Sequence, residues 1–167
     1  LLVYTLYGLR IGCAICYDWL FPEAMRQLAA NGAEIMIRVS AYMDPWGATK
    51  PMDWWTVVNR CRALENTAYV VAANQGAQLK FYPPYSWPGG SQVIDYDGRI
   101  LAQASPGPGE RIVVAPVDIS ALRHDRNARR GGPRFISPDS GGPDTANFEI
   151  FVIILAKART QQSSRIL

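Results

Sequence analysis

Short apolar runs and helical spacing alternate along the first 120 residues of this chain. Residues 9–16 and 34–39 are nearly uninterrupted apolar runs, as expected of strands that are buried on both faces of a sheet. Between them, Pro22 with Glu23 predicts the first turn of a helix, and Asn31-Gly32 predicts its end in a left-handed cap. Strand, helix and strand in so short a stretch are typical of a β-α-β unit.

A second helix is predicted over residues 52–67, because apolar side chains recur there at helical spacing. The face that we expect to pack on the sheet consists of Trp54, Val58, Cys61 and Ala68. The same spacing places Glu65 on this face, and a buried carboxylate needs a cationic partner, for which Arg62 and Arg38 are the candidates. We interpret Glu65 as structural, with a place at the border of an active site as the alternative.

The other predicted elements are, in chain order, a hairpin around Tyr7-Gly8, a strand at 69–73, a hairpin at 91–104 around Asp97-Gly98, a strand at 111–117 and a short helix capped by Ser120. Buried strands that alternate with helices predict an α/β fold. After residue 122 the pattern weakens. We therefore predict one α/β domain over residues 1–122 and an extended tail over 123–167, which we expect to dock on a partner subunit through the apolar segment 148–156.

The composition excludes several classes of protein. Of the 167 residues, 49% are apolar and 19% are charged, which is typical of a globular chain and not of a disordered one. The net charge of +3 is too small to indicate a nucleic-acid partner. No apolar run approaches the roughly 20 residues of a membrane span. Three cysteines without a secretory leader favour the cytoplasm.

Cys16 stands at the carboxyl end of the first buried run, just before a helix. Active groups of α/β sheets usually lie at this edge. A strand-to-helix bend there also leaves the next backbone N–H, that of Tyr17, able to meet a developing oxyanion. A nucleophilic thiol needs a neighbouring cation or base. From its position alone, a buried structural cysteine is the more common interpretation.

Other residues that could carry chemistry have simpler interpretations. Cys13 and Cys16 form a Cys-x-x-Cys pair inside a strand without a second pair, which disfavours zinc or dithiol chemistry. His124 is the only histidine and lies among arginines, so we expect it on the solvated surface. Tyr42 and Trp46, in the loop after the second strand, border a substrate pocket or pack on the surface. No glycine-rich loop marks a phosphate-bearing cofactor, and we expect neither cofactor nor metal.

Several short stretches occur in a recognisable order, namely YGLRIG at 7–12, ICYD at 15–18, FPE at 21–23, GAE at 32–34, RALEN at 62–66, YVVAAN at 69–74 and GS, ID and DG between 90 and 98. Together they resemble the nucleophile region and following blocks of the nitrilase superfamily of carbon–nitrogen hydrolases. Within this superfamily, the stretch from 37 to 43 most resembles the aliphatic amidase and formamidase branch.

This resemblance implies a fold, a reaction and an assembly. The fold would be a partial α-β-β-α sandwich, four-layered when two subunits pack helix to helix in a homo-oligomer. The reaction would be hydrolysis of a non-peptide C–N bond in a small amide, carbamoyl compound or nitrile. A glutamate, a lysine and a cysteine would carry it through a thioester. Cys16 matches the nucleophile, and the Tyr17 N–H matches the oxyanion donor.

The chain departs from the family in one respect. The family's glutamate and lysine precede the cysteine, whereas the fifteen residues before Cys16 contain neither. We therefore expect this chain to be the carboxyl-terminal part of such an enzyme, and to be inactive or nearly so by itself. Acyl transfer shares the thioester and stays open. The alternative from another class is a non-catalytic, truncated relative that acts only as an association module.

Overall fold

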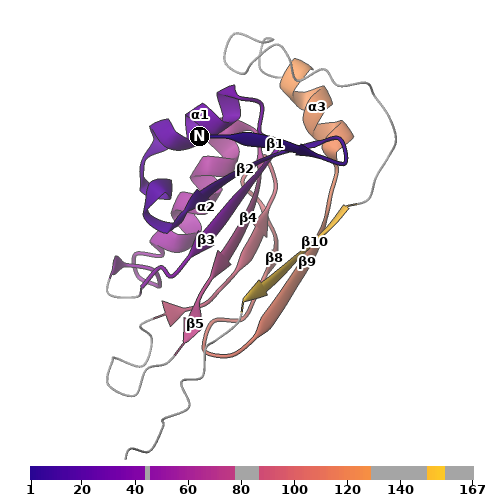
Figure 1. The fold of residues 1–167 in the computed structure, drawn as a ribbon. Coiled ribbons are helices and arrows are strands. Elements are labelled where there is room, and N and C mark those ends of the chain that lie inside the picture. The colour runs from indigo at the N-terminus through magenta and orange to yellow at the C-terminus, as the bar shows by residue number, and fades with distance from the viewer. Residues whose placement is uncertain (44–45, 78–86, 129–149, 157–167) are drawn as a thin grey trace, which may run out of the picture.

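The computed structural model describes residues 1–43, 46–77, 87–128 and 150–156, the last stretch through its backbone (Figure 1). Its elements are β1 (Val3–Leu6), β2 (Leu9–Ile15), the 3-10 helix η1 (Cys16–Leu20), α1 (Pro22–Ala30), β3 (Ile35–Ser40), α2 (Trp54–Asn66), β4 (Tyr69–Asn74), β5 (Gly76–Ala77), β6 (Trp87–Pro88), β7 (Gln92–Ile94), β8 (Ile100–Gln103), β9 (Arg111–Val117), α3 (Ile119–Ala128) and β10 (Ile150–Ala156).

Six strands form the central sheet, in the order β1-β2-β3-β4-β7-β8. Strands β2, β3 and β4 are parallel, with Ile11 beside Ile35 and Ile35 beside Tyr69. Strands β1, β7 and β8 are each antiparallel to their neighbours. The predicted β-α-β unit and both predicted hairpins are confirmed, and so is the α/β class. The carboxyl ends of the three parallel strands meet at one edge of the sheet.

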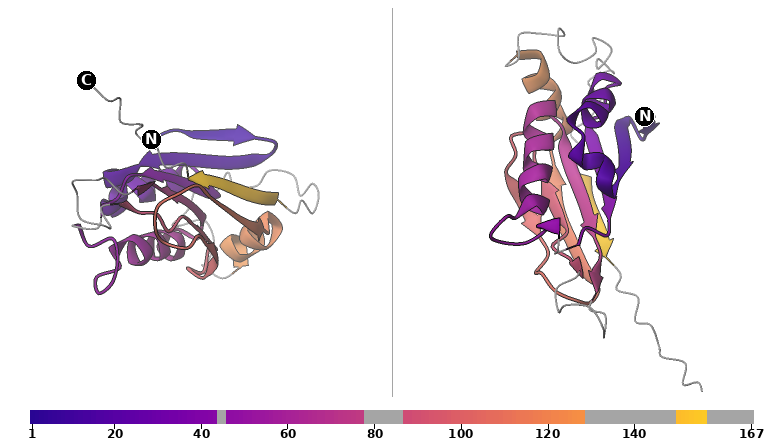
Figure 2. Two further views of the ribbon diagram at one scale, coloured as in Figure 1. Left: turned by 90° about the horizontal axis from the view of Figure 1, so that it is seen from below. Right: turned by 90° about the vertical axis from the view of Figure 1, so that its left-hand side faces the viewer.

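Each face of the sheet is covered by its own apolar cluster. Helices α1 and α2 lie on one face, seen on the left in Figure 1, where Trp19, Leu28 and Met36 are fully buried. The antiparallel pair β9–β10 and helix α3 cover the other face, around Val93 and Leu122. A second view, turned by 90°, shows α1 and α2 on their side of the strands (Figure 2). The described layers are therefore helices, sheet and a second strand pair with its own helix.

Helix α1 begins and ends where the sequence predicted. Pro22 occupies the first helical position, and Glu23 lies in the first turn. The chain leaves the helix through Asn31 and then Gly32, whose φ of +87° lies in the left-handed region. A side chain at Gly32 would collide with the Arg10 guanidinium, which donates to the Asn31 carbonyl at 2.7 Å. Glycine is thus favoured there by its backbone angle, and a larger residue would also displace the Arg10 guanidinium.

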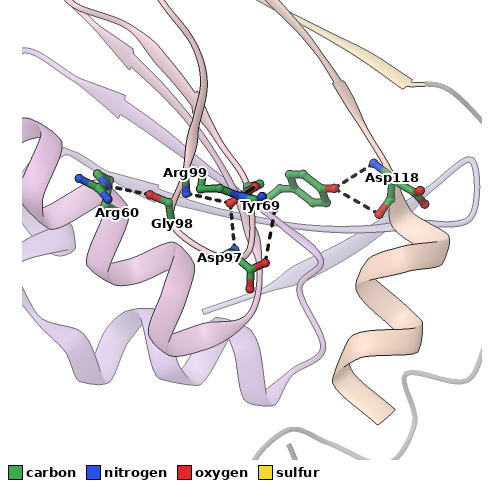
Figure 3. A network of polar contacts seen from close by, with 7 residues as sticks. Arg60, Tyr69, Asp97, Gly98, Arg99 and Asp118 are labelled. Atoms are coloured by element: carbon green, nitrogen blue, oxygen red, sulfur yellow. Dashed lines mark hydrogen bonds and ion pairs between the residues drawn. The ribbon is translucent and has the colours of Figure 1, made fainter. Parts of the chain in front are cut away.

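Polar contacts tie the β7–β8 hairpin and helix α3 to the rest of the fold (Figure 3). The Arg60 Nε on α2 donates to the Gly98 carbonyl in the hairpin turn at 2.7 Å. The Tyr69 hydroxyl on β4 donates to the Asp118 carbonyl at 3.2 Å and accepts from the Asp118 N–H at 2.9 Å. The turn and the start of α3 are therefore anchored directly on the central elements.

The face of α2 that packs on the sheet differs from the predicted one. Trp54 is 46% exposed and Cys61 is exposed, so neither belongs to the buried face. The buried residues are instead Trp55, Asn59, Arg62, Ala63 and Asn66. They also follow helical spacing, but three of the five are polar, so the apolar periodicity of the sequence does not mark this face. Their polar groups are buried because they bind other buried polar groups, as the active-site geometry below shows.

Strand β2 is not buried on both faces. Gly12 and Ala14 are buried against the α1 side, whereas Cys13 is exposed and Ile15 is 64% exposed. The neighbouring strands pair Cys13 with Ile37 and Ile15 with Val39, which is 52% exposed. In the described part of the chain, the β9–β10 layer does not cover this end of the sheet, so the apolar run there faces outward.

The boundary expected at residue 122 falls inside helix α3. Residues 123–128 continue that helix, and Arg126 is buried, with its Nε donating to the Thr67 carbonyl at 2.8 Å. The helix is capped by Asp118, whose Oδ1 accepts the Ala121 N–H at 2.8 Å, and not by Ser120. Strand β10, from the apolar segment expected to dock on a partner subunit, pairs with β9 of the same chain. The stretches 129–149 and 157–167 of the expected tail lie outside the described residues.

None of the described helices is both long and apolar enough to span a lipid bilayer.

Candidate active site

Cys16 lies at the bend between β2 and the short helix η1, as the sequence predicted. Its φ of +45° is in the left-handed region, which a non-glycine residue adopts only at an energetic cost. Such a strained strand-to-helix bend presents its side chain at the carboxyl edge of the sheet. The Cys16 side chain is half-buried. The thiol therefore lies at the edge of the sheet where α/β folds usually place their active groups.

Side chains on both sides hold the bend in place. The Asp18 Oδ2 accepts the Ile15 N–H at 3.0 Å, and the Trp19 Nε1 donates to the Ala14 carbonyl at 3.0 Å. From α2, the Arg62 Nε donates to the Trp19 carbonyl at 3.0 Å. These bonds satisfy backbone groups that a tight bend would otherwise leave unpaired. Arg62 also forms the predicted ion pair with Glu65, at 2.9 Å.

Tyr17 is the second residue of η1. The first N–H groups of a helix have no acceptor within the helix, so the Tyr17 N–H is geometrically able to serve an external oxygen. The Tyr17 ring is 59% exposed and meets the Phe21 ring edge-on, with centroids 5.5 Å apart. Thiol and N–H thus come from adjacent residues of one rigid bend.

Arg38, in the carboxyl-terminal half of β3, contacts the backbone of the bend. Its Nη2 donates to the Cys16 carbonyl at 3.3 Å, and its Nη1 donates to the Asn59 Oδ1 at 2.6 Å. The residue is fully buried. Burial lowers the pKa of Arg38 to about 10, and the nearby Cys16 and Tyr42 oppose part of this fall, so the guanidinium is charged at neutral pH. From the sequence, Arg38 is only a candidate partner of Glu65, and the signal for a further role is its charge inside an apolar strand.

A pocket of about 720 Å³ opens beside the bend. Its lining includes Tyr17, Leu20, Tyr42, Trp46, Lys50 and Trp54. Tyr42 and Trp46, the two loop residues that the sequence singled out, both belong to it. The Tyr42 N–H donates to the Asn74 Oδ1 at 2.7 Å, and its hydroxyl donates to the Trp46 carbonyl at 3.2 Å. Burial raises the pKa of Tyr42. Residues 44 and 45 of this loop lie outside the described part.

The remaining candidates stay away from this pocket. His124 is exposed, as predicted, and Cys61 is exposed on the outer face of α2 rather than packed. Glu65 is half-buried in its pair with Arg62. Across the described ranges, no group of three or more His, Cys, Asp or Glu side chains is placed to hold a metal ion.

The fold and the placement of Cys16 define a class of protein, an α/β domain with a half-buried thiol at the carboxyl edge of its central sheet. The chain matches the family model of carbon-nitrogen hydrolases over residues 2–127, so it belongs to that family.

Proteins of known function and proteins of known structure that resemble this chain include other amidases. The chain is 40% identical over 118 residues to deaminated glutathione amidase from Homo sapiens, covering 70% of this chain and 33% of that one. It is 35% identical over 111 residues to formamidase from Bacillus thuringiensis, and the match covers 66% of this chain and 30% of that one. The chain also superimposes, with a TM-score of 0.58 at 25% identity, on a variant of the amidase from Nesterenkonia sp. AN1 that carries acrylamide at its active-site cysteine. This match covers 77% of this chain and 45% of that one.

The chain spans about a third of the length of these curated relatives. Membership of the family is thereby confirmed. The expected placement in the carboxyl-terminal part of the family's chains is not confirmed by these matches.

Proposed function

We propose that the protein hydrolyses the C–N bond of a small amide, with Cys16 as the nucleophile and a thioester as the intermediate. The observation that carries this proposal is the left-handed bend at Cys16, which presents the thiol and the Tyr17 N–H together beside a pocket. Membership of the carbon-nitrogen hydrolase family and similarity to amidases support it. A structural cysteine needs neither a strained bend nor a neighbouring pocket.

The proposed reaction has two steps. In the first, the Cys16 thiolate attacks the amide carbon, and the Tyr17 N–H binds the oxygen that becomes negative. The C–N bond then breaks, and the amine leaves with a proton from a general acid. In the second step, water attacks the thioester, which releases the carboxylic acid and restores the thiol. The resemblance implies a glutamate for the proton transfers and a lysine for the oxyanion, both from parts of the whole protein outside this chain.

The pocket beside the bend is the proposed site of the substrate's acyl or amine group. Among its lining residues, Tyr42 is buried and fixed by two hydrogen bonds, whereas Trp46 and Trp54 are about half exposed. An aromatic lining favours an amide with apolar surface over a fully polar one. No cofactor is needed for this chemistry.

Replacement of the proposed nucleophile is the direct test. In the whole protein, Cys16→Ala should lower ammonia or amine release from a panel of small amides by at least about a thousandfold, because no thioester can form. Cys61→Ala is the matched control, since Cys61 is exposed on the outer face of α2 and should leave the rate unchanged. Intact-protein mass spectrometry after rapid quenching should show the acyl group on Cys16 alone. Equal rates for Cys16→Ala and the unmodified protein would reject the proposal and favour an association module.

We also propose that subunits assemble helix to helix, as the family's four-layered arrangement implies, and that the protein works in the cytoplasm.

A further inference from the structure

Arg38 is a buried cation that has no carboxylate beside it in the part of the chain that the structure describes. Its side chain is fully buried, and among the described residues no Asp or Glu oxygen lies within ion-pair distance of it. A buried charge is costly unless it is compensated. The other two buried arginines have clearer partners. Arg62 pairs with Glu65, and Arg126 donates to the backbone carbonyls of Thr67 and Ala33 near the opposite end of the sheet.

Neutral groups compensate the Arg38 charge in part. Its guanidinium carbon lies 4.4 Å from the Trp55 ring centroid, 5.2 Å from that of Tyr42 and 5.5 Å from that of Trp19. The negative faces of aromatic rings attract a cation at such distances. Three rings from η1, α2 and the pocket loop thus surround one guanidinium.

A chain of side-chain amides adds to this compensation. Arg38 donates to the Asn59 Oδ1, the Asn59 Nδ2 donates to the Gln92 Oε1 at 3.2 Å, and the Gln92 Nε2 donates to the Thr56 Oγ1 at 2.9 Å. Each amide turns its oxygen toward the cation, so the dipoles add. This arrangement also explains why the buried face of α2 is polar. The Nε of Arg38 still has no acceptor.

The one strained backbone group that the guanidinium contacts is the carbonyl of Cys16. We propose that Arg38 is a positioning residue for the reaction at Cys16: its Nη2 holds the bend in the left-handed conformation, and its positive charge, which no carboxylate of the described residues neutralises, favours negative charge on the thiol. The chain thereby carries its own cation beneath the nucleophile, in addition to any lysine that the rest of the protein supplies.

This role rests on the proposed function, so the experiment has one readout that depends on amide hydrolysis and one that does not. In the whole protein, Arg38→Met should lower kcat about 10- to 100-fold, the range expected when a charged hydrogen bond is lost. KM should stay within about threefold, because Arg38 does not line the pocket. Arg38→Lys keeps the charge and should recover part of kcat. Rates are expressed per titrated Cys16 thiol, so that loss of folded protein is removed from the comparison.

The second readout is the rate at which iodoacetamide alkylates Cys16 at neutral pH, followed by mass spectrometry of the peptide. A nearby cation favours the reactive thiolate, so Arg38→Met should slow alkylation of Cys16 about tenfold or more. Cys61 is exposed on α2 and serves as an internal control within the same sample. Arg126→Met is the matched variant, a buried arginine remote from the bend, and should leave Cys16 alkylation unchanged.

Asn59→Asp keeps the test decisive if the Arg38 variants do not fold. It retains Arg38, its bond to the Cys16 carbonyl and an acceptor at the Asn59 position, but it gives the cation a carboxylate partner. Alkylation of Cys16 should then slow severalfold, although the bend is intact. Wild-type alkylation rates in Asn59→Asp, or in a folded Arg38→Met protein, would overturn the inference. Slowed alkylation in a protein that hydrolyses no amide would retain the role of Arg38 and reject the proposed reaction instead.

Discussion

Tyr96 is the residue whose protonation most directly couples the sheet to helix α3. Its side chain is buried, its ring meets that of Tyr69 edge-on at 5.4 Å, and its hydroxyl binds Asp125 on α3. Burial, together with the hydrogen bond to Asp125, raises the pKa of Tyr96 to about 12. Loss of the phenol proton would therefore weaken this contact between the β7–β8 hairpin and α3.

The sign of the resulting pH dependence follows from this raised pKa. An unfolded tyrosine loses its proton near pH 10, so the stability contributed by Tyr96 is complete below pH 10 and is lost as pH rises toward about 12. Between about pH 8 and about pH 11, the unfolding free energy of the wild type should fall by on the order of 1 kcal/mol more than that of Tyr96→Phe. Urea unfolding of both proteins at the two pH values measures this difference. Identical pH slopes would contradict it.

Single residues also show where sequence analysis succeeded and where it failed. Cys16 and Tyr17 could be singled out because a strand-to-helix junction is a local feature. Arg38 could not, because its role depends on rings and amides from η1, α2 and β7 that are distant in sequence. A charge inside an apolar run indicates that buried partners compensate it, but the sequence does not identify those partners.

At the scale of elements, helix α3 is held to the sheet by a buried ion pair. The Arg123 Nε lies 2.6 Å from the Glu34 Oε1, and the Glu34 side chain is only 1% exposed. Glu34 also accepts the Arg10 N–H at 3.0 Å. The pair joins the start of β3 to a helix 89 residues later, so α3 belongs to the folded domain rather than to a tail.

Arg123→Met should leave the buried Glu34 carboxylate without its main cation. We expect the unfolding free energy to fall by about 2–4 kcal/mol, toward the range measured when one partner of a buried pair is removed. Arg99→Met is the control, because Arg99 is 72% exposed in its pair with Asp95 and should contribute much less. Denaturant unfolding in the whole protein compares the two. An equal, small loss for both variants would show that the α3 contact is not stabilising.

Helix α2 illustrates why the type and the bounds of an element are easier to predict than its orientation. Two faces of α2 have helical spacing, one mainly apolar and one mainly polar. The apolar face was chosen on the general rule that apolar side chains are buried. The rule fails here because Asn59 and Arg62 bind the Arg38 cation and the carbonyls of η1, which only the assembled fold brings together.

At the scale of the whole molecule, one face of strands β1 to β3 carries exposed apolar side chains. Tyr4, Leu6, Ile15 and Val39 lie on this face and are between 52% and 64% exposed. Exposed apolar side chains on one face favour association. In the whole protein, we expect this face to be covered.

The chain of residues 1–167 produced alone should therefore self-associate and should release no ammonia above background from amides that the whole protein hydrolyses. Leu6→Lys combined with Ile15→Lys should shift its sedimentation profile toward the monomer, because two charges interrupt the apolar surface. Tyr7→Lys, in the turn beyond this face, should not. A monomeric, active wild-type chain would contradict both the exposed face and the need for outside partners.

The sequence by itself determined the α/β class, the β-α-β unit and its caps, the hairpins and the bend at Cys16. These features depend on periodicity, on turn chemistry and on neighbours along the chain, all of which are local. The tertiary structure decided which face of α2 is buried, that α3 and β10 belong to the domain, and which cation contacts the Cys16 bend. Those outcomes depend on the cost of burying polar groups, and that cost is known only when the partners that satisfy them have been brought together from distant parts of the chain.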